Sequence, residues 1–105
     1  MNEIVVMTTV SEREAAELLA SRLVEERLAA CVQILPPMTS VYRWKGEVQN
    51  ETEYLLLIKT TDDKWKGLSE FIHANHPYEV PELIAVEAAK IAPAYQKWLG
   101  EQVAT

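Results

Sequence analysis

The side chains best suited to chemistry in this chain are a histidine and a glutamate in one proline-containing segment. His76 and Glu82 both lie in HPYEVPE, where Pro77 and Pro81 stiffen the chain between them. An imidazole and a carboxylate together suit copper or zinc, so the pair is a candidate metal site. A structural role stays open: the prolines would shape a turn, His76 would bond a backbone carbonyl, and Glu82 would begin a strand.

A second histidine, His73, forms the pattern H-x-x-H with His76. On a continuous helix this spacing would place both imidazoles on one side, where they could share a metal. The alternative is that His73 is a solvated helix residue and His76 belongs to the following turn. The single cysteine, Cys31, begins a predicted strand among apolar neighbours, which is typical of a buried, unreactive thiol. No Ser/His/Asp or Cys/His arrangement is visible, so the sequence does not predict an enzyme.

A group of aromatic and basic residues crowds the middle of the chain. Tyr42, Arg43, Trp44 and Lys45 are consecutive, a composition typical of anchors at a subunit interface. The functional alternative is an aromatic-lined ligand cleft. Lys59 ends a predicted strand and could hold an anion at such a cleft, although a charged residue at a strand end needs no further function.

The element that must position these residues is an over-long β-hairpin from Ala30 to Thr60. One tight turn signal, Lys45-Gly46, interrupts it, and Pro36-Pro37 indicate a bulge, a bend or an exposed edge. Two arms of roughly 14 residues would span about 45 Å. A compact chain of this length has a radius of gyration of about 13 Å. The hairpin must therefore bend sharply, or overhang its domain and be covered by another subunit.

Apolar periodicity predicts the elements that flank the hairpin. They are a strand at Glu3–Thr9, a helix from Ser11 to about Arg27, a helix at about Asp62–Asn75, a strand at Glu82–Glu87 and a helix that opens at Pro93. Ser11 and Glu14 fit a capping box, and Asn75 is a candidate left-handed cap. The order β-α-β-β-α-β-α predicts an α+β fold, the ferredoxin-like split β-α-β sandwich with an antiparallel sheet and an added C-terminal helix.

The residues that should face the core follow from the same spacing. The expected faces are Ala16, Leu19, Ala20 and Leu23 on the first helix, Trp65, Leu68 and Ile72 on the second, and Tyr95, Trp98 and Leu99 on the third. The continuous apolar run from Tyr54 to Ile58 predicts a strand that is covered on both faces.

Length and composition narrow the class of protein. The chain has 105 residues, which predicts one domain over residues 1–105. Ten basic and sixteen acidic residues give a formal charge of −6, which disfavours a nucleic-acid partner. One cysteine and no secretory leader favour the cytoplasm. No apolar stretch approaches the length of a membrane span, so no membrane partner is expected.

Three segments together resemble the CutA family of divalent-cation tolerance proteins. They are Leu28–Val32 (LAACV), Ser40–Glu47 (SVYRWKGE) and His76–Leu83 (HPYEVPEL), and the pair Lys59-Thr60 also fits. Each motif alone is weak, but all of them in order at the right spacing make a specific match. The resemblance covers essentially the whole chain.

The resemblance implies a non-enzymatic homotrimer with the ferredoxin-like fold, whose long hairpins pack around a three-fold axis. It also implies a role in the response to divalent metal ions and no required cofactor, with copper or another divalent cation as an optional ligand. The implied metal contacts are His76, Glu82 and Met7, where Met7 occupies a position that is cysteine in some members. A thioether suits Cu(I) better than Cu(II) or zinc.

The alternative reading rests on a likeness of the trimer to PII signalling proteins. In that reading the protein is a signalling or scaffold trimer. Its subunit clefts would bind a small anionic ligand or a partner protein, and the residues to test would be Lys59, Tyr78, Trp44 and Tyr42.

Overall fold

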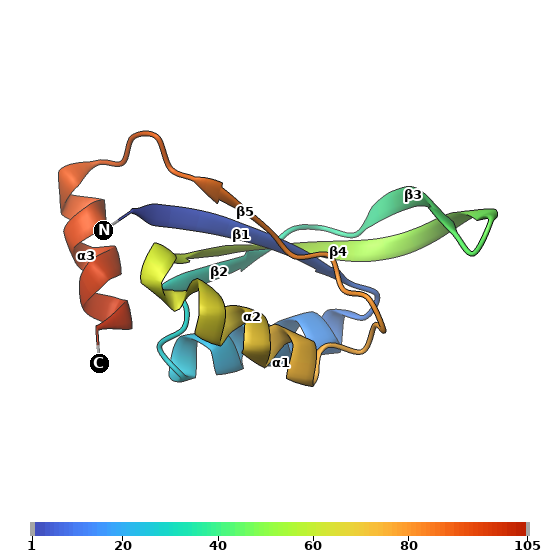
Figure 1. Ribbon diagram of the computed structural model, residues 1–105, viewed down its shortest axis with the longest axis horizontal. Helices are drawn as coiled ribbons and strands as arrows, with labels where there is room; N and C mark the ends of the chain where they lie inside the picture. The colour runs from blue at the N-terminus through green and yellow to red at the C-terminus, as the bar shows by residue number, and fades with distance from the viewer. Residues whose placement is uncertain (1, 105) are drawn as a thin grey trace.

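The order of elements along the chain is the predicted one, except that the first arm of the hairpin is split into two strands. The computed structural model describes residues 2–104 (Figure 1). Its elements are β1 (Glu3–Val10), α1 (Arg13–Glu25), β2 (Cys31–Ile34), β3 (Met38–Trp44), β4 (Glu47–Thr61), a 3₁₀ turn (Asp62–Lys64), α2 (Trp65–Asn75), β5 (Ile84–Glu87) and α3 (Pro93–Val103). The α+β class with an antiparallel sheet and a C-terminal helix is confirmed.

Strand β4 is the centre of the sheet, because three other strands pair with it. The strand order is β2-β4-β1-β5, and all pairs are antiparallel. The inner part of β4, Tyr54–Thr61, pairs with β1, and Leu56–Lys59 pairs with β2 on the other side. The outer part, Glu47–Glu53, pairs only with β3.

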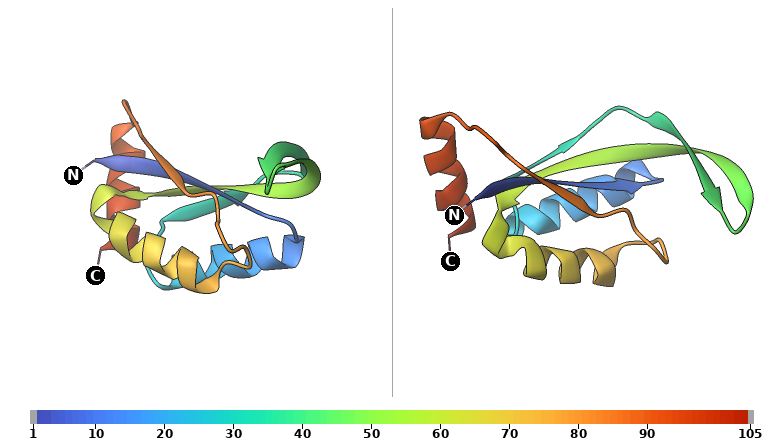
Figure 2. Two further views of the ribbon diagram at one scale, coloured as in Figure 1. Left: turned by 45° about the vertical axis from the view of Figure 1, so that its right-hand side comes forward. Right: turned by 45° about the horizontal axis from the view of Figure 1, so that its top comes forward.

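The β3–β4 hairpin projects from the rest of the fold, as the sequence predicts. Lys45 and Gly46 have φ angles of 50° and 82°, the positive values that a two-residue type I′ turn requires. Pro36 and Pro37 lie between β2 and β3, where the first arm bends. The molecule therefore measures 44 × 25 × 23 Å, and Figure 2 shows the hairpin extending beyond both helices.

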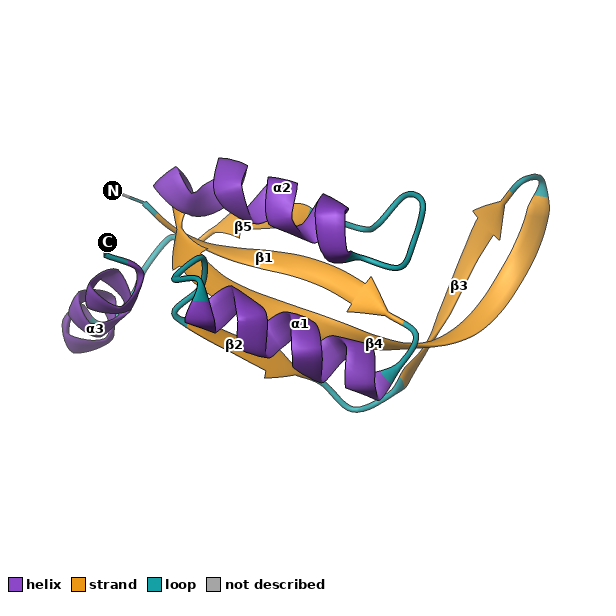
Figure 3. Ribbon diagram, turned by 90° about the horizontal axis from the view of Figure 1, so that it is seen from below, coloured by secondary structure: helices purple, strands orange, loops and turns teal. Residues whose placement is uncertain are grey.

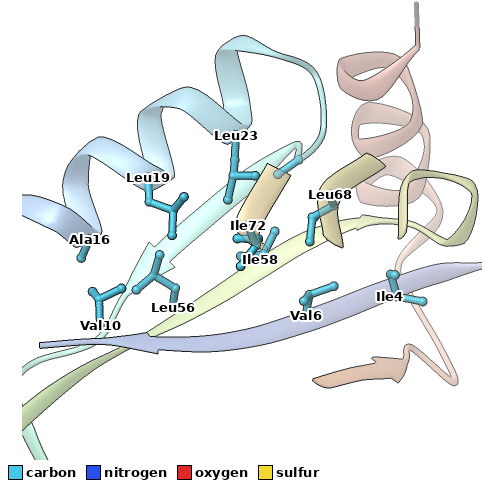
Figure 4. Packing of buried hydrophobic residues seen from close by; sticks show 11 residues of the cluster. Ile4, Val6, Val10, Ala16, Leu19, Leu23, Leu56, Ile58, Leu68 and Ile72 are labelled. Atoms are coloured by element: carbon cyan, nitrogen blue, oxygen red, sulfur yellow. The ribbon is translucent and has the colours of Figure 1, made fainter. Parts of the chain in front are cut away.

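Helices α1 and α2 lie side by side against one face of the sheet and enclose the core (Figure 3). Figure 4 shows their apolar side chains meeting those of the two central strands. The fully buried members include Val6, Val10, Ala16, Leu23, Leu56, Ile58, Leu68 and Ile72. The predicted core faces of both helices are confirmed, and Trp65 and Ala20 pack at the edge of the cluster.

The opposite face of the sheet is only partly covered, so the predicted two-sided burial of β4 is wrong within one chain. Leu56 and Ile58 are buried under the helices, whereas Leu55 and Leu57 on the other face are half-buried. No helix of residues 2–104 lies across that face, apart from α3 at one end (Figure 1). The continuous apolar run Tyr54–Ile58 therefore includes residues on a sheet face that a single chain does not cover.

Helix α3 packs at the end of the sheet through fewer residues than predicted. Leu99 and Val103 are buried with Ala30, but Tyr95 and Trp98 are 37% and 40% exposed. The helix touches the sheet along one narrow stripe, and its two aromatic rings pack on each other instead, with centroids 5.4 Å apart. The predicted docking face is thus wrong for the two aromatic residues.

Local signals at the ends of α1 misled the prediction. The predicted capping box does not form: Glu12 occupies the N-cap position, and no side chain caps the helix. The helix also ends two residues early because Arg27 takes a left-handed conformation, with φ of 57°. The N–H of Leu28 then bonds the carbonyl of Leu23, which closes the helix as a Schellman motif does.

The predicted left-handed cap at Asn75 is also wrong. Asn75 Nδ2 donates to the carbonyl of Phe71, 2.9 Å away, and α2 ends because His76 is extended ahead of Pro77. Strand β5 begins at Ile84, so Glu82 belongs to the loop. Across residues 2–104, no helix is both long and apolar enough to cross a bilayer.

Candidate functional site

The loop between α2 and β5 is anchored by the buried side chain of His76. Its Nε2 lies 2.7 Å from the carbonyl of Thr9 at the end of β1. Its Nδ1 accepts a hydrogen bond from the backbone N–H of Tyr78 at 3.0 Å. An acceptor at Nδ1 and a donor at Nε2 define a neutral imidazole with its proton on Nε2. Both ring nitrogens are therefore occupied by the protein itself.

The surroundings of His76 favour this neutral form. Burial is the main cause that lowers the pKa of His76, and nearby His73 acts in the same direction. The hydrogen bond to Thr9 and the charge of Glu53 act in the opposite direction and do not overcome burial. His76 therefore has the structural role that was the alternative to metal binding: it bonds a backbone carbonyl, that of Thr9.

A second link ties the same loop to the base of the hairpin. Tyr78 Oη donates to Glu53 Oε2 at 2.6 Å, and the Tyr78 ring meets the His76 ring edge-on with centroids 4.7 Å apart. Glu53 is only 5% exposed. The pKa of Tyr78 is raised, first by burial and then by its hydrogen bond to Glu53. Tyr78 is therefore the neutral donor and Glu53 the acceptor in this pair.

A cleft of about 740 Å³ lies between the hairpin and this loop. The hairpin contributes Ser40, Val41, Tyr42, Trp44, Glu51 and Glu53, the loop contributes Tyr78, Glu79, Val80 and Glu82, and Thr9 and Ser11 lie where β1 ends. Four of these side chains are carboxylates and three are aromatic. No lysine, arginine or histidine is among them. The cleft is suited to a cationic ligand and not to the small anion of the alternative interpretation.

Four of the predicted site residues meet in this cleft. Tyr42, Trp44, Tyr78 and Glu82 all line it, so residues far apart in sequence are brought together as a site requires. Tyr42 shares the cleft with Glu51 and Glu53. Burial is the main cause that raises the pKa of Tyr42, and the charges of these two carboxylates act in the same direction.

Lys59 lies elsewhere. It is the cross-strand partner of Cys31, and its Nζ is 5.9 Å from the ring centroid of Tyr95 at the α3 end of β4. Cys31 is half-buried, so it is less enclosed than predicted. Lys59 does not line this cleft, because the cleft lies beside the outer part of β4, whereas Lys59 is in the inner part. Its predicted role at a cleft between subunits stays a prediction.

The structure does not bring the three predicted metal contacts into one cluster. Glu82 is exposed in the cleft, Met7 is half-buried on the open sheet face between Leu57 and Ile84, and His76 is buried behind the cleft. Within residues 2–104, no group of three His, Cys, Asp or Glu side chains is arranged to hold a metal ion.

The two histidines do not act as a pair either. His73 is exposed on α2, with its Nδ1 2.8 Å from the carbonyl of Ser69. This is the solvated helix residue of the alternative interpretation.

The sequence interpretation missed the acidic wall of the cleft. Glu51 and Glu53 are two residues apart in β4 and point to the same side, the side on which Ser40 and Tyr42 of β3 also lie. The sequence signal that could have revealed this wall is the period-two spacing of residues in β3 and β4, because residues two apart in a strand share a face. It becomes meaningful only with the hairpin register, which pairs Ser40 with Glu51.

Comparison with known proteins gives a consistent result. The sequence profile described as "CutA1 divalent ion tolerance protein" matches residues 4–102. A divalent-cation tolerance protein CutA of Thermus thermophilus is 50% identical over 101 residues, which are 96% of this chain and 97% of that protein. A solved structure of the CutA1 protein from Thermus thermophilus superimposes with a TM-score of 0.92, covering 95% of this chain and 97% of the other.

Other relatives differ in length or in the location that their names give. A chloroplastic CutA protein of Arabidopsis thaliana is 48% identical over 91% of this chain, which spans only 53% of that protein. A structure described as a periplasmic divalent cation tolerance protein from Archaeoglobus fulgidus is 30% identical. It has a TM-score of 0.94 and covers 97% of this chain and 99% of its own.

Proposed function

This chain belongs to the CutA1 divalent ion tolerance protein family, and on that premise we propose that it acts in divalent-cation tolerance as a homotrimer without catalysis. The observation that carries the proposal is the projecting hairpin. Val41 and Val48 on its two arms are 64% and 59% exposed, although β-branched apolar residues favour covered strands. A second chain that packs against the hairpin would bury them.

The free edge of the sheet supports the same proposal. Strand β5 pairs with β1 on one side only, and Ile84 and Val86 are about half exposed. An exposed apolar edge strand is a template for pairing with another chain unless it is covered. The half-open face at Leu55 and Leu57 adds further apolar surface beside it.

Light scattering of the purified protein should give a mass three times the chain mass of 11.9 kDa. The double variant Ile84→Lys/Val86→Lys should lower that mass, because charges on an edge strand oppose pairing. Leu18→Lys is a matched control, since Leu18 is 63% exposed on α1, away from the hairpin and β5. A mass equal to one chain for the unmodified protein would contradict the proposal.

We also propose that copper or another divalent cation binds through Glu82, with His76 as a second contact; Met7, on the open sheet face between Leu57 and Ile84, is not part of this proposal. Glu82 is exposed and available. His76 can join only if it gives up one of its two hydrogen bonds, which costs about 1–3 kcal/mol for the buried group left unpaired. Binding should therefore be weak. The single cysteine favours the cytoplasm as the compartment in which this occurs.

Calorimetric titration of the metal-free protein with Cu(II), in a weakly competing buffer, tests the metal contact. We expect weak, saturable binding that Glu82→Gln weakens at least tenfold, about 1.4 kcal/mol. Glu101→Gln, an exposed carboxylate on α3, should leave it unchanged. Equal binding by all three proteins would show diffuse attraction to an acidic surface and would contradict a site at Glu82.

A further inference from the structure

We propose that Arg22 on α1 is a positioning residue for His76, because it holds the last turn of α2 and thereby keeps the imidazole on its two backbone partners. Arg22 lies in the helix layer, which covers the sheet face opposite to the open one (Figure 3). Its effect on metal affinity rests on the contact proposed above at His76 and Glu82. Its effect on the loop after α2 does not.

Arg22 makes two contacts with the last turn of α2. Its Nη1 donates to Oδ1 of Asn75 at 3.0 Å, and its Cζ lies 4.9 Å from the centroid of the Phe71 ring. A planar guanidinium can bond and stack in this way at the same time. The Nδ2 of Asn75 in turn donates to the carbonyl of Phe71 at 2.9 Å. The Asn75 amide is therefore held on both sides, and one arginine contacts both residues that this bond joins.

These contacts are the polar link between the two helices. Within residues 2–104, no other side-chain hydrogen bond or ion pair joins α1 to α2. Beside the link lies a hollow of about 180 Å³, which Leu18 and Pro77 line together with Arg22 and Asn75. Apolar packing between α1 and the end of α2 is therefore incomplete at this point. A cation beside the C-terminus of a helix is also favourable, so Arg22 is well placed to stabilise this turn.

The last turn of α2 sets the position of His76. The N–H of His76 donates to the carbonyl of Ile72 at 2.8 Å, which ties its backbone to the helix. Pro77 restricts the same backbone from the other side, since a proline limits the conformation of the residue before it. The imidazole itself is buried and bonded at both nitrogens. We therefore expect the imidazole to leave Thr9 only when this turn moves and the contacts of Arg22 break.

Arg22 therefore stabilises the anchored form of the loop, in which His76 bonds the protein. A cation held through Glu82 gains His76 as a second contact only in the released form. The apparent affinity for the cation is reduced by the small fraction of chains in that form. Removal of the Arg22 contacts should raise this fraction and with it the affinity. A residue that only stabilised the fold would not raise the affinity when it was removed.

Hydrogen exchange of the Tyr78 amide, followed by NMR on the metal-free protein, tests the positioning role. This N–H bonds Nδ1 of His76, so it exchanges when the imidazole leaves. We expect Arg22→Ala to speed its exchange roughly tenfold, the combined effect of one hydrogen bond and one exposed cation–π contact. Arg22→Lys should restore part of the protection, because an ammonium can donate to Asn75 but cannot stack as a plane. Arg22 is exposed, so both variants should fold normally.

Arg13→Ala is the matched control, since it removes the same charge from the same helix. Arg13 is 61% exposed and pairs with Glu17 of its own helix. The exchange of the Tyr78 amide should change less than about twofold in this variant. The amide of Gln96, which bonds the carbonyl of Ala92 in α3, reports on opening elsewhere and should not respond to either variant.

Calorimetric titration with Cu(II) supplies the second readout. Arg22→Ala should bind Cu(II) up to about tenfold more tightly than the unmodified protein, and Arg13→Ala should not. The positioning role is overturned if Arg22→Ala leaves the exchange of the Tyr78 amide unchanged, or if Arg13→Ala speeds it equally. Faster exchange with unchanged or weaker copper binding would overturn the effect on the metal contact. If neither protein binds Cu(II) saturably, the proposed metal contact fails, and the exchange rates alone decide the positioning role.

Discussion

Replacing His76 with alanine should lower the free energy of unfolding by about 3 kcal/mol, because two buried backbone groups lose their partner. The carbonyl of Thr9 and the N–H of Tyr78 both bond the imidazole. These bonds join the end of β1 to the loop after α2, so their loss also loosens one wall of the cleft. Urea denaturation at a fixed protein concentration measures the effect, since the stability of an oligomer depends on concentration.

His73→Ala is the internal control for this experiment. His73 lies three residues earlier on the exposed side of α2 and bonds only a carbonyl of its own helix. Its loss should cost less than about 0.5 kcal/mol, as for most surface substitutions. His76→Gln should recover part of the stability, because its amide N–H can donate to Thr9 but cannot restore the second bond. Equal losses at His73 and His76 would refute the anchoring role.

The anchoring bond also has a pH signature. Burial lowers the pKa of His76 below its value in the unfolded chain, about 6.5. As the pH falls below that value, the unfolded chain takes up a proton first. Stability is therefore complete above about pH 6.5 and falls toward the folded pKa, by at most about 1.4 kcal/mol per pH unit. The acid-dependent loss should be smaller in His76→Gln.

Tyr78→Phe should cost about 2 kcal/mol, the range for a hydrogen bond to a charged group, because it removes the donor to a buried carboxylate. Glu53 would keep its burial and lose Tyr78 Oη, 2.6 Å away. Denaturant titration of Tyr78→Phe, Glu53→Gln and the double variant gives the coupling between the two side chains. Tyr95→Phe, at a half-exposed phenol on α3, should be nearly neutral. Additive losses at Tyr78 and Glu53 would rule out a direct bond between them.

The order of elements was predictable because strong local signals mark its boundaries. Lys45-Gly46 can adopt the two positive φ angles of a tight hairpin turn, Pro77 ends α2, and Pro93 opens α3. These residues act through their own backbone restrictions, which do not depend on the rest of the fold. The prediction was wrong where a residue can satisfy its hydrogen bonds in more than one way. Asn75 was expected to adopt a left-handed conformation, but its side chain bonds the carbonyl of Phe71 instead.

The site was predictable only in part, because its chemistry depends on distances across the fold. Tyr42, Trp44, Tyr78 and Glu82 were identified by residue type and by the resemblance of their motifs, and they do meet. Glu53 gave no comparable signal, since one glutamate in an alternating strand is normally solvated. Its burial arises only when the loop carrying Tyr78 folds over the base of the hairpin. Sequence alone also could not show that Lys59 lies away from this cleft, because it does not reveal which end of a 15-residue strand faces a cleft.

The triple pairing of β4 also sets the order in which the sheet can assemble. Pairing with β3 closes a two-residue turn, a local event on a scale of about 1–10 μs for a hairpin. Pairing with β1 joins Glu3 to Thr61, and closing so long a loop carries a larger entropic cost. The projecting hairpin should thus form early and present its inner half as a template, while the arrival of β1 limits the folding rate.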